Sequence, residues 1–161
     1  MPTGLILHES TPYVTYMPPV FDSIGDDLIR ALNWRIICPE CGGPVDQTYS
    51  FEGAEQTWIT GEQLVREVRD NPDIQWWWGL LQGFPADVSR EDVEMEDVPD
   101  IQDDTGIWTN PVSMRSRYSV VEIEAFDSSM TIVISSDEEL IGRLKADFPD
   151  CELLEEYNSG I

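Results

Sequence analysis

The stretch IQWWWGLLQGFP, residues 74–85, constrains the fold most, because it is almost continuously apolar. Neighbouring residues of a β-strand point to opposite faces of a sheet, so Trp76, Trp77 and Trp78 need cover on both sides. The run predicts a central strand buried on both faces, with Trp76 and Trp78 on one face and Trp77 on the other. The alternative is that one indole, with Trp77 the best candidate, stacks on a ligand or anchors a partner.

Two segments of the C-terminal third alternate between apolar and polar residues with the period of a strand. These segments are 119–126 and 130–135, and the polar turn between them predicts a hairpin that pairs with the tryptophan strand. Residues 22–34, 58–72 and 136–150 carry apolar side chains at helical spacing. Strands and helices do not alternate one by one. The pattern favours one α+β domain, residues 1–161, with a mainly antiparallel sheet and about three helices.

Helix starts are predicted from the residues that cap them. Ser23, Thr60 and Ser136 are the expected N-caps, the last two with Gln63 and Glu139 three residues later. Further strands are predicted for residues 4–9, for 34–40, ending at Pro39, and for 47–52. The prolines within residues 11–21 predict an irregular connection.

The charge of the chain is strongly negative. It has 32 acidic and 9 basic residues, which gives a net charge of −23. Such a field repels nucleic-acid backbones and anionic membranes, because their phosphates carry the same sign. It attracts a basic protein and accelerates its capture. The alternative is that the charge serves only to keep the protein in solution.

Acidic residues are concentrated in residues 86–106, the sequence ADVSREDVEMEDVPDIQDDTG. This composition predicts a long, exposed and mobile loop, with a short helix starting at Ser89. Apolar residues are nevertheless spaced through and just beyond it, which a purely solvated loop does not need. They would anchor the loop on another protein, and are Val93, Met95, Val98, Ile101 and Ile107.

The sequence CPECGG places Cys38 and Cys41 in a spacing typical of zinc knuckles. Structural zinc needs four ligands, and the remaining candidates are His8 and Cys151. The favoured interpretation is a tight turn with two ordinary thiols and no cofactor, and zinc is the alternative.

No catalytic motif stands out in the chain. His8 is the single histidine, so a serine nucleophile has no other candidate base, and there is neither a Walker loop nor a Gly-x-Gly-x-x-Gly motif. The N-terminus lacks the basic region of a signal peptide, and no stretch approaches the ~20 apolar residues of a membrane span. These features predict a non-enzymatic protein of the cytoplasm, without membrane contact.

A family resemblance covers residues 74–158. The segments WWWGLLQGFP, IWTNP, VEIEAFDSSMTIVISSDEELIGRLKADFP and LEEYN resemble small bacterial proteins of the immunity type, which accompany polymorphic toxins. Phe126 stands where that group has tryptophan in the hairpin turn. The resemblance implies a bacterial, non-enzymatic α+β protein and no catalytic residues.

These observations together predict an acidic immunity or antitoxin-like protein. It would bind and neutralise a cognate toxin that is basic and nuclease-like, as a monomer or small homo-oligomer, without contacting nucleic acid directly. The alternatives are a small zinc-knuckle adaptor and an inhibitor that mimics DNA. The expected partner-binding residues are Asp97, Asp100, Asp103, Asp104, Trp108 and Trp77.

Overall fold

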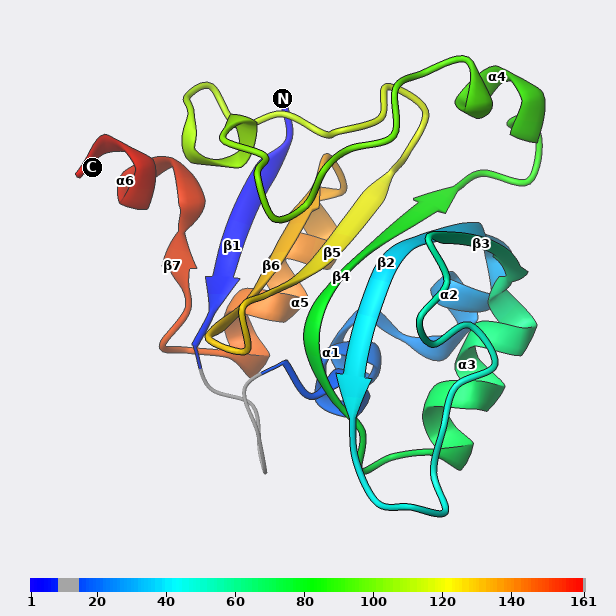
Figure 1. The fold of residues 1–161 in the computed structure, drawn as a ribbon. Coiled ribbons are helices and arrows are strands. Elements are labelled where there is room, and N and C mark those ends of the chain that lie inside the picture. The colour runs from blue at the N-terminus through cyan, green and yellow to red at the C-terminus, as the bar shows by residue number, and fades with distance from the viewer. Residues whose placement is uncertain (9–14, 161) are drawn as a thin grey trace.

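A computed structural model describes residues 1–8 and 15–160 of the chain. They form a seven-stranded sheet in the order β3-β2-β4-β5-β6-β1-β7, in which all neighbouring strands are antiparallel (Figure 1). The strands are β1 (Thr3–Leu7), β2 (Asn33–Gly42), β3 (Gln56–Thr60), β4 (Gln75–Phe84), β5 (Val121–Phe126), β6 (Met130–Ser135) and β7 (Glu152–Leu153). The predicted α+β class with a mainly antiparallel sheet is confirmed.

Helices cover one face of the sheet, and an extended segment covers the other (Figure 1). The helices are α1 (Met17–Ile24), α2 (Asp26–Ala31), α3 (Gly61–Asp70), α4 (Arg90–Glu94), α5 (Glu138–Asp147) and α6 (Leu154–Ser159), with a 3₁₀ turn, η1 (Gly106–Trp108). The helices α1, α2, α3 and α5 share the main core with the sheet. The opposite face is covered by residues 86–119 and α6, which we call the covering side.

The main core is built on one row of residues that crosses five strands. Its members are direct cross-strand neighbours, and all are fully buried: Leu5, Val133, Ile123, Leu81 and Ile36. Because side chains alternate along each strand, the adjacent row faces the covering side instead. Its members on β2, β4 and β5 are polar, and they are central to the candidate site.

The tryptophan strand β4 lies inside the sheet between β2 and β5, as the apolar run predicts. Trp76 belongs to the main core under the helices, whereas Trp78 packs on the covering side. The prediction that these two share a face was wrong. Cys41 is opposite Trp76 and Glu40 is opposite Trp78, so Trp77 is an extra residue, a β-bulge, which shifts the alternation by one.

The predicted N-cap of α3, Thr60, is confirmed, and the predicted N-cap of α5, Ser136, is one residue too early. The hydroxyl of Thr60 accepts a hydrogen bond from the N–H of Gln63 at 3.2 Å and caps α3. At α5 the cap is Asp137 rather than Ser136, and its carboxylate accepts from the N–H groups of Glu139 and Leu140. A carboxylate serves this position well because it also faces the positive end of the helix dipole.

The first helical region differs most from its prediction. One helix capped at Ser23 was expected, but Ser23 is buried within α1, which begins at Met17 with prolines in its first turn. Proline fits there because the first turn of a helix needs no N–H donor. Gly25, with φ at +97°, separates α1 from α2, since few other residues adopt that conformation. Residues 9–14, which include the end of the first predicted strand and the start of the predicted irregular connection, lie outside the residues that the structure describes.

Two strand predictions also need correction. Residues 47–52 are not a strand, and 50–52 lie in a turn. The strand is β3 at Gln56–Thr60, part of which was expected to be the start of a helix. The strand that was expected to end at Pro39 continues to Gly42. It does so through an irregularity in which Cys38 and Pro39 together face Gly79 of β4. The β5–β6 hairpin and its pairing with β4 are confirmed.

Candidate protein-binding surface

Residues 86–119, which we call the covering segment, lie across the sheet opposite the helices. Apolar side chains attach it: Val93, Ile101, Ile107 and Val112 are all at most 7% exposed. Ile101 packs on Ile37 and Leu80 of the sheet. Most of residues 86–106 are exposed, as the composition predicts, but three of the residues expected to anchor on a partner, Val93, Ile101 and Ile107, are buried in the protein's own fold.

A row of buried polar side chains crosses the sheet beneath this segment. Arg35, Gln82 and Glu122 are cross-strand neighbours on β2, β4 and β5. Nε and Nη2 of Arg35 donate to Oε1 of Gln82 at 2.9 and 2.7 Å, and Nε2 of Gln82 donates to Oε2 of Glu122 at 2.8 Å. The amide thus connects a guanidinium with a carboxylate, although Nη1 of Arg35 is buried without a hydrogen-bond partner among the described residues.

The covering segment completes this row through its backbone. The Glu122 carboxylate accepts from the N–H groups of Arg115 and Ser116 at 2.7 and 3.1 Å, and from the hydroxyl of Ser119 at 2.9 Å. Hydrogen bonds to a buried charged acceptor are among the stronger ones in proteins. The interactions fix residues 115–119 over β5.

Arg115 adds a second connection between the segment and the sheet. Its guanidinium pairs with Glu124 of β5 and, at 3.0 Å, with Asp104 of the segment itself. Burial raises the pKa of the Glu124 carboxyl to about 7; pairing with Arg115 opposes this shift, while Asp104 and Glu122 add to it. One guanidinium therefore serves three acidic groups, and its loss would leave buried carboxylates uncompensated.

Glu96 connects two distant parts of the covering segment. Its carboxylate accepts from the Ser116 hydroxyl at 2.6 Å and from the N–H of Arg117 at 3.1 Å. Asp100 organises a turn by accepting from the N–H groups of Gln102 and Asp103 at 3.2 and 3.3 Å. The acidic part of the segment is thus held in one shape by side-chain hydrogen bonds.

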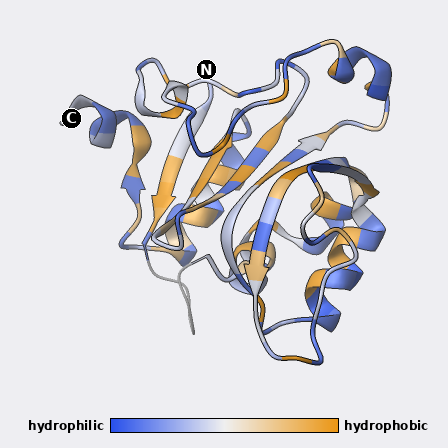
Figure 2. Cartoon of the chain, in the orientation of Figure 1, coloured by the Kyte–Doolittle hydropathy of each residue, from blue (hydrophilic) through white to orange (hydrophobic). Residues whose placement is uncertain are grey.

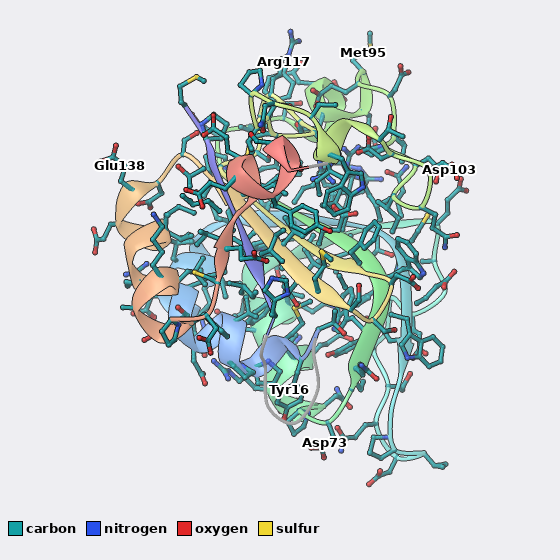
Figure 3. The ribbon with its side chains drawn as sticks, turned by 90° about the vertical axis from the view of Figure 1, so that its left-hand side faces the viewer. Tyr16, Asp73, Met95, Asp103, Arg117 and Glu138 are labelled. Carbon is teal, nitrogen blue, oxygen red and sulfur yellow. The ribbon has the colours of Figure 1, made fainter. Side chains whose placement is uncertain are left out.

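Most carboxylates of the segment are exposed to solvent, Asp100 among them. Asp87, Glu91, Asp92, Glu94, Asp97, Asp100 and Asp103 are exposed. Met95 and Val98 are 86% and 46% exposed between them, and Figure 3 shows Met95 and Asp103 at the outer boundary of the molecule. In Figure 2 α4 is mostly hydrophilic, whereas the strands below it also carry hydrophobic segments. We call residues 87–103 the acidic surface.

The expected partner-binding residues divide into two groups. Asp97, Asp100 and Asp103 are exposed on the acidic surface, and the side chain of Asp104 is 22% exposed and engaged by Arg115. Trp108 is partly buried and packs edge-on against Phe126, with ring centroids 5.0 Å apart. Asp104 and Trp108 therefore have structural partners.

Trp77 is the exposed member of the tryptophan run, at 46%. Its ring lies against Gly42, where a Cβ atom would clash with it. Its neighbour Trp78 contacts Phe126, with ring centroids 4.9 Å apart, and shares a cluster with Ile101 of the covering segment. The bulge in β4 thus gives the two-faced strand one indole that faces solvent.

The cysteines do not assemble into the metal site that their spacing suggests. Cys38 and Cys41 lie within β2 rather than in a turn, and they contribute to clusters on opposite faces of the sheet. Burial raises the pKa of the Cys38, Cys41 and Cys151 thiols. His8 pairs with Glu152, and over residues 1–8 and 15–160 no three His, Cys, Asp or Glu residues are placed to hold a metal ion.

Comparison of the chain with protein-family models, with curated proteins and with solved structures finds no match. Within the described residues, none of the helices has both the length and the apolar character needed to cross a membrane. The site must therefore be interpreted from its own geometry.

Sequence reasoning missed the buried polar row. Its signal was present, because Arg35 and Gln82 each stand beside apolar residues in the middle of a strand. Glu122 and Glu124 were correctly assigned to the face opposite Val121, Ile123 and Ala125. What the sequence does not reveal is that a segment as acidic as 86–106 covers that face.

Proposed function

We propose that the protein is a non-enzymatic, immunity-like inhibitor, and that its acidic surface binds a basic, nuclease-like toxin. The observation that carries the proposal is that Asp97, Asp100 and Asp103 are exposed on a backbone held by buried anchors and by the Arg115 and Glu96 interactions. The carboxylates are thus arranged before a partner arrives.

Preorganisation bears directly on affinity. A disordered acidic loop loses conformational entropy when it binds, whereas a fixed one loses little. Exposed Met95 and Val98 lie between the carboxylates and supply apolar contact. Interfaces gain most of their affinity from a few such desolvated groups, and charge mainly sets the association rate and the choice of partner.

The sign and size of the charge favour a nuclease-like target. Enzymes that act on nucleic acids have basic substrate channels, and a net charge of −23 steers this protein towards them. The resemblance over residues 74–158 supports the same class, and an immunity protein of this kind would act in the cytoplasm. A DNA-mimicking inhibitor is the same proposal with a DNA-binding surface as its target. The zinc-adaptor alternative loses support because Cys38 and Cys41 lie on opposite faces.

Growth rescue tests the proposal. The protein is co-expressed in bacteria with each nuclease-type toxin gene that neighbours its own gene, and colony counts are compared with a strain that expresses the toxin alone. Rescue against at least one toxin is expected, and rescue against none would contradict the function.

Two matched triple variants then test the surface. Asp97→Asn, Asp100→Asn and Asp103→Asn remove three exposed charges while keeping side-chain acceptors for the turn at Asp100. Control changes at Asp46, Asp70 and Asp147, also exposed and also to Asn, remove the same charge elsewhere. Only the first set should abolish rescue, and equal loss in both would assign the effect to net charge alone.

A further inference from the structure

The strand β3 forms one edge of the sheet. It pairs with β2 on one side, and no strand of the described residues pairs with the other. Its residues, Gln56–Thr60, are uncharged and include the strongly strand-forming Trp58 and Ile59. Edge strands are commonly protected by charged residues, proline or bulges, and β3 itself has none of these.

The hydrogen-bond pattern shows which backbone groups face the open side. The N–H of Gly61 donates to Leu32 at 3.0 Å, and the N–H of Cys38 donates to the carbonyl of Glu55 at 2.9 Å. Glu55 and Gly61 flank β3, and both direct their backbone towards β2. Because direction alternates along a strand, Gln56, Trp58 and Thr60 direct their N–H groups away from β2.

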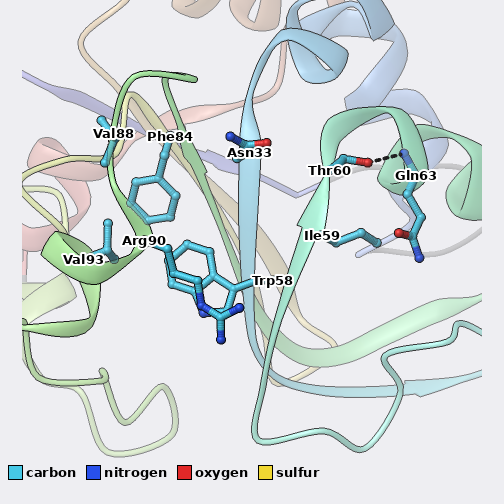
Figure 4. A pocket seen from close by; sticks show the side chains of 9 residues that line it. All are labelled: Asn33, Trp58, Ile59, Thr60, Gln63, Phe84, Val88, Arg90 and Val93. Carbon is cyan, nitrogen blue, oxygen red and sulfur yellow. Dashed lines mark hydrogen bonds between the residues drawn. The ribbon is translucent and has the colours of Figure 1, made fainter.

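A pocket of about 310 Å³ lies at this edge, where β3 meets the ends of β2 and β4 (Figure 4). Three consecutive β3 residues line it, Trp58, Ile59 and Thr60. Its other walls come from β2, β4, α3 and the first part of the covering segment: Asn33, Phe84, Gln63, Val88, Arg90 and Val93. The volume is large enough for one apolar side chain of a partner.

Two cations flank the indole of Trp58. The guanidinium carbons of Arg35 and Arg90 lie 5.6 and 5.1 Å from its ring centroid, within the range of cation–π attraction. Nε1 of Trp58 is enclosed and has no hydrogen-bond partner among the described residues. The two guanidinium groups thus hold the indole as part of the pocket wall.

Carboxylates surround the edge, two of which, Glu62 and Glu94, pair with Arg30 and Arg90. Glu55 and Glu62 flank β3 on either side, and Glu91 and Glu94 lie beside Arg90 on α4. All four are exposed. A second copy of this protein would bring another strongly negative surface to the same place, so charge favours a basic occupant over self-association.

We infer that β3 is a docking edge on which an extended, basic segment of the partner adds a further antiparallel strand and inserts one apolar side chain into the pocket. The inference rests on the proposed function, because it names how the basic partner binds. Main-chain hydrogen bonds along the edge would give affinity, and the pocket would select the side chain.

The test measures the affinity of the full-length protein for a labelled decapeptide of alternating lysine and valine with one central leucine. Gln56→Pro removes one outward N–H and keeps the pairing with β2, since proline is tolerated at the first residue of an edge strand. Gln56→Ala is the matched control, because it removes the same side chain and keeps the N–H. Gln56→Pro should weaken binding about tenfold relative to Gln56→Ala.

A second measurement needs no variant. On adding the peptide, amide hydrogen exchange of Gln56 and Trp58 should slow, whereas Thr57 and Ile59, already bonded to β2, should change little. A peptide of the same sequence, N-methylated at the residues that pair, should not bind.

Equal affinity of Gln56→Pro and Gln56→Ala for the peptide would overturn the docking edge. Binding of the N-methylated peptide as tightly as the unmodified one would overturn it as well. The Asp97, Asp100 and Asp103 triple variant is included to separate the two proposals. Loss of toxin rescue in that variant with unchanged peptide affinity in Gln56→Pro refutes the edge alone. Slowed exchange at the edge without any rescue by the wild type refutes the toxin function alone.

Discussion

Arg115, in the covering segment, pairs with Glu124, in the middle of β5, and the two side chains are 8% and 1% exposed. This pair connects an acidic segment to a sheet face that itself carries carboxylates. Without the guanidinium, Asp104, Glu122 and Glu124 would repel one another, which would weaken the attachment of the segment to the sheet. The buried cation therefore contributes, together with the apolar anchors, to the position of the acidic surface.

Replacing Arg115 should both destabilise the fold and release the segment. Arg115→Leu leaves buried carboxylates uncompensated, so the free energy of unfolding at neutral pH should fall by about 3–5 kcal/mol. Arg117→Leu is the control, because Arg117 is exposed and its side chain contacts the neighbouring Tyr118 ring and hydroxyl, while its backbone bond to Glu96 does not depend on the side chain. Urea unfolding measures the loss, and limited proteolysis should cut within 95–105 in Arg115→Leu alone. Equal stability of the two variants would refute the role given to Arg115.

Glu124 should make stability depend on pH near neutrality. Its pKa in the folded protein, about 7, lies above that of an ordinary glutamate, so the folded state holds its proton to higher pH than the unfolded state does. Its contribution is fully present below about pH 4.3 and is lost as the pH rises towards 7.

The variant Glu124→Gln isolates this contribution, because it mimics the protonated group at every pH. Between about pH 4.5 and 7.5, wild type should lose roughly 3 kcal/mol of unfolding free energy relative to Glu124→Gln, with no further change above. Chemical denaturation across this range measures the difference. A constant difference would show that Glu124 is ionised in the folded protein throughout.

Truncation of the apolar residues of the covering segment should reduce stability strongly at the buried anchors and little at the exposed side chains. Ile101 is 3% exposed and packs on Ile37 and Leu80, so Ile101→Ala should cost about 2–4 kcal/mol of stability. Val98, 46% exposed in the same segment, should cost less than about 0.5 kcal/mol on truncation to alanine. Comparable losses at both positions would mean that the segment is not attached as described.

The three tryptophans of β4 should also behave differently. Trp76 is fully buried against Tyr49 and Phe51, so Trp76→Ala should cost about 3–5 kcal/mol. Trp77→Ala should cost about 1 kcal/mol or less, because the ring is 46% exposed. Thermal unfolding measures both. A loss at Trp77 as large as that at Trp76 would assign both indoles to the core.

Periodicity was sufficient to predict the β5–β6 hairpin, α3 and the two-sided burial of β4. These elements are set by local patterns that tertiary contacts do not override. The faces of Trp76 and Trp78 were not predictable, because the bulge at Trp77 depends on how β4 pairs with β2. A single extra residue in one strand reverses every later assignment of face.

The acidic segment shows a second limit of sequence reasoning. Its composition is that of a mobile loop, yet Val93, Ile101 and Ile107 are buried. What holds it is a long-range arrangement of Arg35, Gln82, Glu122 and Arg115, drawn from three strands and the segment itself. Cys38 and Cys41 illustrate the same point, since their spacing suggests a turn and their pairing with β4 makes them part of a strand.

The rate at which the protein associates with a toxin against which it rescues growth tests the central claim most directly. Stopped-flow association is measured at several salt concentrations for wild type, for the Asn variant at positions 97, 100 and 103, and for the control Asn variant at positions 46, 70 and 147. The first variant should associate about tenfold more slowly at low salt and depend less on salt, while the control matches wild type. Equal slowing of both variants, or of neither, would contradict an acidic surface that captures the partner.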